Sequence, residues 1–209
     1  MTDGQPEDPE VEYLETVEGE VTLSIAGGQS MQGWEGELMH ASADILCGFG
    51  SEFLEAGLGL GLSALRIAGS PRTRRHRVIE RYPRVVELFT ARHVEIPATL
   101  EIVCADWFDF IETVPPESVD GIFFDPALPT PMWDDTAVWD RVVPAMRRAL
   151  RMGGALVPFF TTRPYLRWQY LREFDRVLVE RRQFRAYSTT HYTAATEGDA
   201  FIQCFIRTR

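Results

Sequence analysis

Three glycines at alternate positions, Gly57, Gly59 and Gly61, stand between a strand-like segment and a helix-like segment. Glycine has no Cβ, so a glycine-rich turn can bend sharply and let a ligand approach the backbone. The N–H groups at the start of the following helix would point at that ligand. The segment 53–64 therefore predicts a nucleotide-type cofactor site, although a plain strand–helix turn could carry the same glycines.

Acidic residues stand at the ends of the next two predicted strands, where they could hold an adenosine. Glu80 ends the segment HRVIE (76–80). It follows the glycines by about 20 residues, a spacing at which an acid can accept both ribose hydroxyls. Asp106 and Trp107 stand at the end of the third strand and could flank adenine. A solvated acid at a helix start and a core tryptophan remain the alternatives for Glu80 and Trp107.

One further acid, Glu55, stands just before the glycines, two residues from Gly57, and helps to choose between cofactors. The order here is ExGxGxG, whereas the fingerprint of nicotinamide dehydrogenases is GxGxxG. Glu55 could reach the ammonium group of S-adenosylmethionine (SAM), directly or through water. We therefore expect SAM, with S-adenosylhomocysteine as product, rather than a nicotinamide cofactor.

Two carboxylates are the candidates for catalysis. Asp125 ends the apolar segment VDGIFFD (119–125), at the carboxyl edge where ligands of α/β sheets bind. Glu35 follows Trp34 in the helix predicted over 30–48. A turn-capping acid and a solvated helix acid are the alternatives. Asp134 and Asp135 are typical of helix N-caps and receive no catalytic role.

The elements that must position these side chains alternate along the chain. Continuous apolar strands separated by helices indicate a parallel sheet covered on both faces. We expect an α/β, Rossmann-like fold with a mainly parallel seven-stranded sheet, a C-terminal antiparallel hairpin and an N-terminal lid helix. The expected strands are 21–28, 51–57, 76–80, 99–106, 119–125, 155–160, 177–188 and 200–209, and the expected helices are 30–48, 62–69, 83–94, 107–114, 139–151 and 164–173.

Length and composition limit the kinds of partner that the chain can have. The 209 residues suit one domain over 21–209, preceded by an acidic segment, 1–20, that we expect to be unstructured. A net charge of −10, with arginine as the sole Lys/Arg-type residue, argues against a nucleic-acid partner. The chain has neither a long apolar run nor a signal-peptide pattern, which predicts a cytoplasmic protein with no membrane span. We expect a small-molecule substrate, no metal, buried thiols at Cys47, Cys104 and Cys204, and homodimerisation as an option.

Several segments in order resemble guanidinoacetate N-methyltransferase and the related arginine δ-N-methyltransferases, which are class I SAM-dependent enzymes. The segment VTLSIAGGQSMQGWEGELMHA resembles the family's short strand followed by a Met-x-x-Trp-Glu helix, and FLEAGLGLGLSA resembles its glycine loop. HRVIER, CADWFDF, VDGIFFD and RALRMGGALVPFFTT resemble its next strands and its acceptor loop. The Trp-Glu helix and the Gly-Ile-x-x-Asp strand are the most specific of these segments.

The resemblance implies a role for each matching residue. The cofactor group joins the acids and glycines above with the residues that would lie against SAM, hold its ribose or border its adenine: Met31, Met39, Glu55, Gly57, Gly59, Leu60, Gly61, Leu62, Glu80, Asp106, Trp107, Phe108 and Asp125. The substrate group would face the guanidino group or receive the carboxylate end of the acceptor: Trp34, Glu35, Asp125 and the backbone at Thr161 and Thr162.

The expected chemistry is methyl transfer to a guanidino nitrogen of arginine or a relative. Each carboxylate can accept N–H bonds from the guanidinium fork, and one can take the proton. After Asp125 the family has Thr-Tyr-Pro-Leu, whereas this chain has Pro126-Ala127-Leu128-Pro129. Another acceptor therefore stays open: a peptide, a carboxylate or a phenol, with His40 or His191 as a base. A non-catalytic SAM-binding subunit is the third alternative.

Overall fold

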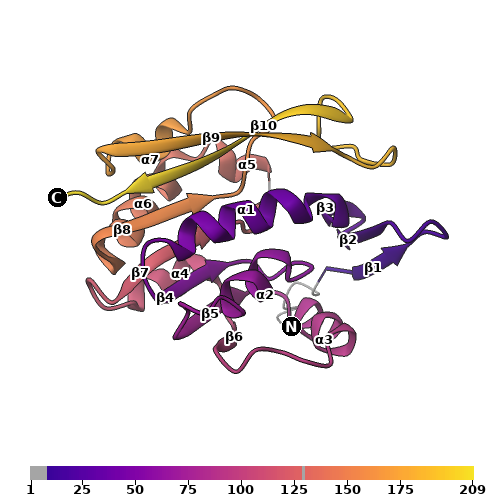
Figure 1. Cartoon of the computed structure of the whole chain (residues 1–209), viewed down its shortest axis with the longest axis horizontal. Coiled ribbons are helices and arrows are strands. Elements are labelled where there is room, and N and C mark those ends of the chain that lie inside the picture. Colours follow the sequence, from indigo (N-terminus) through magenta and orange to yellow (C-terminus); the bar gives the residue numbers. More distant parts are fainter. Residues whose placement is uncertain (1–8, 129) are drawn as a thin grey trace, which may run out of the picture.

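The computed structural model describes residues 9–128 and 130–209. Its main sheet has seven strands in the order β6-β5-β4-β7-β8-β10-β9 (Figure 1). The first five pair in parallel, and β10 runs antiparallel to both of its neighbours. The expected sheet and its closing hairpin are confirmed. The bounds are β4 (Glu52–Ala56), β5 (Arg75–Glu80), β6 (Leu100–Cys104), β7 (Val119–Phe124), β8 (Leu150–Pro158), β9 (Arg176–Arg185) and β10 (Glu197–Ile206).

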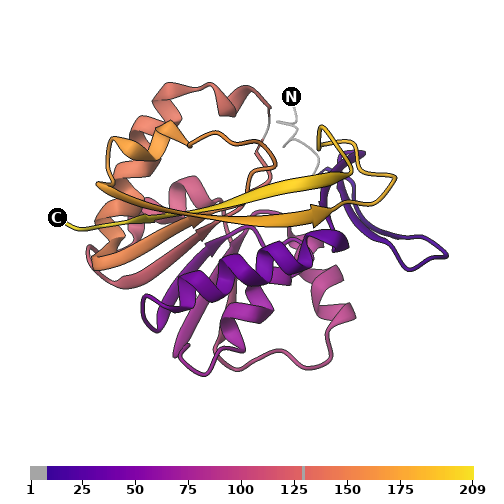
Figure 2. The ribbon, with the colours of Figure 1, turned by 45° about the horizontal axis from the view of Figure 1, so that its top comes forward.

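Helices cover both faces of this sheet and bury two apolar clusters (Figure 2). On one face the cluster joins the sheet to α1 (Gly36–Cys47), α2 (Leu62–Ala68) and α3 (Pro83–Arg92). On the other face it joins the sheet to α4 (Trp107–Thr113), α6 (Thr136–Ala149) and α7 (Trp168–Leu171). The short helix α5 (Thr130–Trp133) lies outside the expected set. Within the described chain, no helix has the length and apolarity needed to cross a bilayer.

The sheet changes winding direction between β4 and β7, which are neighbours in space and distant in sequence. Chain connections leave toward opposite sides at such a point, and a crevice opens at the carboxyl ends of the two strands. Gly57 follows β4, and Asp125 follows β7 and donates its backbone N–H to the carbonyl of Ala56. The fold therefore places the glycine loop and the predicted catalytic aspartate side by side.

A second, three-stranded antiparallel sheet covers this edge: β1 (Val11–Glu15), β2 (Val21–Ile25) and β3 (Gly28–Gln32). Ala26 and Gly27, with φ of 52° and 74°, form the tight turn between β2 and β3. Positive φ at both turn residues is the preferred geometry of a two-residue hairpin. In Figures 1 and 2 this sheet projects beside the seven-stranded sheet, near the connection between β9 and β10.

This small sheet corrects two expectations. Residues 1–8 lie outside the described part of the chain, but Val11–Glu15 is a paired strand, so the segment 1–20 is not unstructured throughout. The helix expected over 30–48 is instead the end of β3, a 3₁₀ turn η1 (Gly33–Glu35) and then α1. The helical spacing of apolar residues hid the hairpin, because β3 is short and mostly polar.

Two smaller differences concern a helix and a thiol. The helix expected over 164–173 is limited to α7, preceded by an irregular stretch. Cys47 and Cys204 are buried as expected, but Cys104 is exposed because it ends β6 at the edge of the sheet. The predicted cap is confirmed, since Asp135 accepts bonds from the backbone N–H groups of Ala137 and Val138.

Candidate active site

A cavity lies at the carboxyl edge of the sheet, beneath the N-terminal sheet. It is lined by residues from β3, the glycine loop, the end of β5, the start of α4 and the segment after β7. Eight of the residues assigned to the cofactor from sequence are in its wall: Met31, Gly57, Gly59, Glu80, Asp106, Trp107, Phe108 and Asp125. Side chains from segments nearly 100 residues apart in sequence thus meet in one place.

The glycine loop has a backbone that other residues would not adopt easily. Gly57 and Gly59 have φ of 88° and 54°, a region that glycine enters without steric cost. A Cβ at Gly57 would lie 2.5 Å from the carbonyl oxygen of Asp125. The glycines are therefore needed for the close approach of the loop to the segment after β7.

One N–H of this loop has only a weak acceptor. The backbone N–H of Leu60 donates to the thioether Sδ of Met31 at 3.3 Å, and a thioether sulfur accepts hydrogen bonds poorly. Tyr13 in β1 donates its hydroxyl to the carbonyl of Gly59 at 2.7 Å. A carboxylate would satisfy the Leu60 N–H better than sulfur does, which fits the methionine end of SAM.

Glu80 is buried at the end of β5 and is held by the backbone. Its two carboxyl oxygens accept bonds from the N–H groups of Leu58 at 2.8 Å and Tyr82 at 2.9 Å. Burial raises the pKa of Glu80, and these backbone bonds oppose the shift. The backbone N–H groups of Gly59 and Arg81 also lower this pKa, and Glu80 lines the cavity, where ribose hydroxyls could reach its carboxyl group.

The start of α4 forms the wall expected to border adenine. Asp106 caps this helix by accepting the Phe108 N–H at 2.8 Å. Trp107 is 3% exposed, and its ring packs on Phe124 in the core. Its buried indole N–H has no acceptor within the described residues. Trp107 is thus both a core residue and part of the cavity wall, so the two sequence interpretations are compatible.

Five residues assigned to the cofactor do not line this cavity: Met39, Glu55, Leu60, Gly61 and Leu62. Met39 lies wholly in the core because it belongs to α1 rather than to the hairpin that carries Met31. Gly61, with φ of 78°, packs against the ring of Phe89. The Leu60 side chain is buried in the core, and its backbone N–H lies under Met31, which does line the cavity.

Glu55 also faces away from the cavity. Strand alternation directs its side chain under α2, where it accepts the hydroxyl of Ser63 and lies 3.0 Å from Nε2 of His76. All three side chains are buried. The expected contact between Glu55 and the SAM ammonium group is absent from the cavity lining, and a structural role for this acid takes its place.

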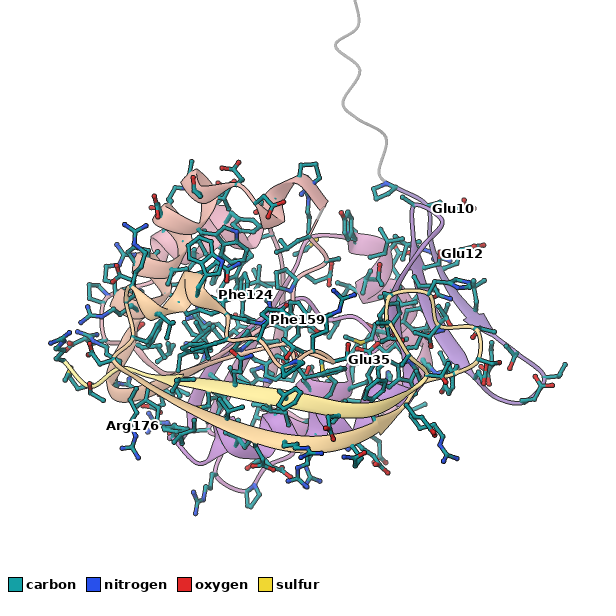
Figure 3. The ribbon with its side chains drawn as sticks, turned by 90° about the horizontal axis from the view of Figure 1, so that it is seen from above. Glu10, Glu12, Glu35, Phe124, Phe159 and Arg176 are labelled. Atoms are coloured by element: carbon teal, nitrogen blue, oxygen red, sulfur yellow. The ribbon has the colours of Figure 1, made fainter. Side chains whose placement is uncertain are left out.

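A second cavity, of 570 Å³, shares a wall with the first. The shared residues are Ser30, Asp125, Pro126, Ala127 and Leu128; Pro129 lies outside the described residues. Glu35 and Asp125 both line the second cavity, which is therefore the candidate acceptor site. Figure 3 shows Glu35 beside the connection between β9 and β10, with Phe159 further toward the middle of the molecule.

Glu35 is 7% exposed and accepts two short hydrogen bonds on Oε1. The donors are the backbone N–H of Gln32 at 2.7 Å and the hydroxyl of Tyr192 at 2.6 Å. Burial raises the pKa of Glu35 to about 7, although both hydrogen bonds lower it. At neutral pH this carboxyl is poised to lose its proton when a cation enters the cavity.

The pKa of Asp125 is raised by burial and also by neighbouring charges. Burial raises the pKa of Asp125 well above its ordinary value, and the negative charges of Glu35 and Glu55 raise it further. The charge of Arg167 acts in the opposite direction. Two carboxyls that repel one another titrate as a pair, and such a pair gains most from a cation that bonds to both.

Trp34 does not line the acceptor cavity, contrary to expectation. Its ring stacks on Tyr192, with centroids 6.2 Å apart, and packs against Phe160 and Phe184. Trp34 therefore supports the wall from behind. Tyr192, which lines the cavity, was missed because its loop meets Glu35 across 157 residues, a separation that no local pattern reveals.

The backbone at Thr161 and Thr162 was expected to bind the acceptor's carboxylate, and both residues line the cavity. The N–H of Thr161 is already used, because it donates to the carbonyl of Phe201 at 3.0 Å. Thr161 therefore anchors the loop to β10 rather than offering a donor. The N–H of Thr162 has no acceptor in the described chain. Arg163 and Tyr165 also line this wall and were not anticipated.

The two adjoining cavities suit the transfer of a group from a cofactor in the first to an acceptor in the second. The first cavity has donors and acceptors for the two ends of SAM. The second is lined by two carboxyls, of which Asp125 lies in the wall shared with the first cavity and Glu35 does not. His40 and His191 line neither cavity. Within the described residues, no group of three or more His, Cys, Asp or Glu side chains is placed to hold a metal ion.

Comparison with known proteins agrees with this geometry. A family model described as guanidinoacetate N-methyltransferase matches residues 7–170. Spermidine synthase from Thermotoga maritima is similar in structure, with a TM-score of 0.72 at 15% identity, over 98% of this chain and 71% of that one. The N-methyltransferase NodS from Bradyrhizobium japonicum has a TM-score of 0.61 at 18% identity, over 84% and 97%. At these identities the structural likeness shows the fold alone.

Proposed function

The chain belongs to the guanidinoacetate N-methyltransferase family and is a SAM-dependent methyltransferase, and we propose that its acceptor is a guanidino nitrogen of arginine or a related small molecule. The observation that carries the proposal is that two acids, the buried Glu35 and the half-buried Asp125, line the acceptor cavity, and that Asp125 also lines the cofactor cavity. A planar cation that bonds to both acids would relieve the repulsion between them. A neutral phenol or a carboxylate acceptor would not.

Different residues of the cofactor cavity would bind different parts of SAM. The backbone N–H of Leu60 would exchange its bond to Met31 for one to the carboxylate end of SAM, Glu80 would hold the ribose, and Trp107 and Phe108 would border adenine. SAM supplies an electrophilic methyl group when bound. Asp125 borders both cavities, so it would hold the acceptor nitrogen where that methyl group arrives.

The two acids would then perform the proton chemistry. A guanidinium ion has no nucleophilic lone pair, and its pKa lies above about 12. Glu35 and Asp125 would accept its N–H groups, fix one nitrogen in line with the methyl group, and take the proton that this nitrogen releases as the N–C bond forms. Their raised pKa values favour this last step, because a carboxylate in that state is a stronger base than a solvated one.

A methyl-transfer assay tests the proposal. SAM would be offered with arginine, guanidinoacetate, agmatine, an arginine-containing peptide and a phenol, for the wild type, Asp125→Asn and, as a control, Asp109→Asn. Asp109 lines neither cavity, so its variant should keep activity. We expect methylation of a free guanidine that disappears in Asp125→Asn. Transfer to the peptide or phenol alone would refute the small-molecule guanidine as acceptor.

A further inference from the structure

A buried arginine, Arg167, stands in the irregular stretch after β8 and lines neither cavity. It is 2% exposed. Its guanidinium carbon lies 3.8 Å from the centre of the Phe159 ring, and its Nη2 donates to the carbonyl of Phe159 at 3.2 Å. Its backbone N–H donates to Oε1 of Gln203 in β10 at 3.0 Å. Contacts of both the backbone and the side chain therefore fix the position of this guanidinium.

Phe159 connects the guanidinium with the strand end that carries Asp125. It follows β8 and donates its backbone N–H to the carbonyl of Phe124, the residue before Asp125, at 3.0 Å. Figure 3 shows Phe124 and Phe159 close together in the middle of the molecule. Phe159 and Asp125 also line the acceptor cavity together, whereas Arg167 does not line it. The charge of Arg167 thus lies behind Phe159, at the edge of the sheet where Asp125 stands.

A guanidinium in this position keeps its positive charge. Burial lowers the pKa of Arg167, and the charges of Tyr170, Tyr165 and Asp125 act in the opposite direction. The ordinary pKa of a guanidinium lies above about 12, so the group stays ionised over the whole range in which carboxyls titrate. Little water screens a buried charge, and its effect on its neighbours is therefore stronger than that of a solvated one.

The protonation of Asp125 depends on burial and on the charges around it. Burial raises the pKa of Asp125, as do Glu35 from η1 and Glu55 from β4, while the charge of Arg167 lowers it. Tyr192, which bonds to Glu35, stays neutral because burial raises the pKa of its hydroxyl. Among these groups, Arg167 is thus the one whose charge favours the ionised form of Asp125.

We propose that Arg167 is a positioning residue that acts through Asp125, because its fixed positive charge keeps the carboxyl group ionised and ready to receive the guanidinium of the acceptor. This inference rests on the proposed guanidino acceptor and deepens it. Arg167 lines neither cavity, so it would influence the reaction through Asp125 and not by contact with either substrate.

Direct titration of Asp125 tests this role without any acceptor. The protein would carry ¹³C in its aspartate carboxyl carbons and be titrated by NMR as the S-adenosylhomocysteine complex, with Asp125→Asn to identify the signal. We expect the midpoint to rise in Arg167→Gln, whose amide can still donate to the Phe159 carbonyl but carries no charge, and to return toward the wild-type value in Arg167→Lys. An unchanged midpoint in Arg167→Gln would overturn the proposal. If Arg167→Gln does not fold, Arg167→Met gives the same comparison.

The pH profile of kcat/KM for arginine tests the consequence for catalysis. Loss of a nearby opposite charge shifts the titration of a carboxyl by about one unit or more. Arg167→Gln should therefore lose about tenfold on the acidic limb and recover at alkaline pH. Arg207→Gln is the matched control, because Arg207 is also largely buried and donates to the backbone carbonyl of Arg147 but lines neither cavity. Its acidic limb should keep its position.

The outcomes separate this inference from the proposed function. If the wild type methylates arginine and Arg167→Gln loses activity equally at every pH, Arg167 serves packing alone and the guanidino acceptor stands. If the wild type methylates no guanidine, the proposed acceptor fails, and the NMR titration still decides whether Arg167 controls the charge of Asp125.

Discussion

Removal of the Tyr192 hydroxyl should move the pH dependence of the reaction toward higher pH. Tyr192 donates to Oε1 of Glu35 at 2.6 Å, and this bond stabilises the ionised carboxylate. In Tyr192→Phe this hydrogen bond is lost, so the pKa of Glu35 rises further above its ordinary value. Only the hydrogen bond from the Gln32 N–H then opposes the effect of burial. Glu35 must be ionised to receive a guanidinium, so activity at neutral pH should fall.

The size of the shift follows from the strength of such a bond. Hydrogen bonds to charged groups contribute about 1.5–3 kcal/mol, and 1.36 kcal/mol corresponds to one pKa unit. Tyr192 is 43% exposed, so water will replace part of the lost bond, and we expect a rise of about one unit. From a starting pKa of about 7, the ionised fraction at about pH 7.5 then falls from roughly three quarters to roughly one quarter, a threefold loss of kcat/KM.

The assay is kcat/KM for arginine across about pH 6 to 9.5, because this ratio reports the ionisation of the free enzyme. The acidic limb should lie near the pKa of the Glu35–Asp125 pair in the wild type and about one unit higher in Tyr192→Phe. Tyr187→Phe, in the same loop and with no hydroxyl bond to a described residue, is the matched control. A uniform loss at every pH would refute the reasoning and assign Tyr192 to packing alone.

Three further predictions concern stability and packing. Glu35→Gln should abolish transfer yet raise the free energy of unfolding at about pH 8 by up to about 3 kcal/mol. The pKa of Glu35 is about 7 in the folded protein and 4.5 when the carboxyl is free, so the wild type loses stability as pH rises between these values. An unchanged pH dependence of chemical denaturation in the variant would contradict this prediction. Gly61→Ala should cost about 1–3 kcal/mol more than Gly27→Ala, since both have positive φ but only Gly61 meets another side chain, Phe89; equal melting temperatures would exclude this contact. Met39→Ala should destabilise the fold by about 2–5 kcal/mol and leave the SAM dissociation constant nearly unchanged, which calorimetry can check.

The sequence identified the site residues that strand ends position. Gly57, Glu80, Asp106 and Asp125 all stand at the carboxyl ends of parallel strands. An alternating pattern of strands and helices brings such ends together at one edge, whatever the details of packing. For these residues, recognition of the fold was sufficient to predict that they meet in one cavity.

Some residues assigned to the cofactor site lie outside its cavity, because their side chains point in another direction than the motif suggested. Glu55 belongs to the same motif as the glycines, but strand alternation turns it under α2. Met39 shares the predicted helix with Met31, but the hairpin ends before α1, so the two methionines lie in different elements. A β2–β3 hairpin was available from the Ala26-Gly27-Gly28 sequence, which is a turn signal that helical periodicity outweighed.

The residues that sequence analysis missed come from the two loops of the C-terminal half. Tyr192 and Arg163 have no motif of their own, and their two loops are positioned by contacts with segments far away in the chain. Tyr192 meets Glu35, and the Arg163 loop is anchored on β10 through Thr161. Loops of this kind carry specificity on a rigid sheet, and their geometry requires the folded structure.

The position of the transferred methyl group tests the central claim most directly. Arginine labelled with ¹⁵N in the guanidino group would be incubated with the enzyme and SAM labelled with ¹³C in the methyl group, and the product examined by NMR. The account predicts a ¹³C methyl group coupled directly to a guanidino ¹⁵N, formed by the wild type and not by Asp125→Asn. A methyl group on the carboxylate or the α-amino group, or transfer that persists undiminished in Asp125→Asn, would contradict it.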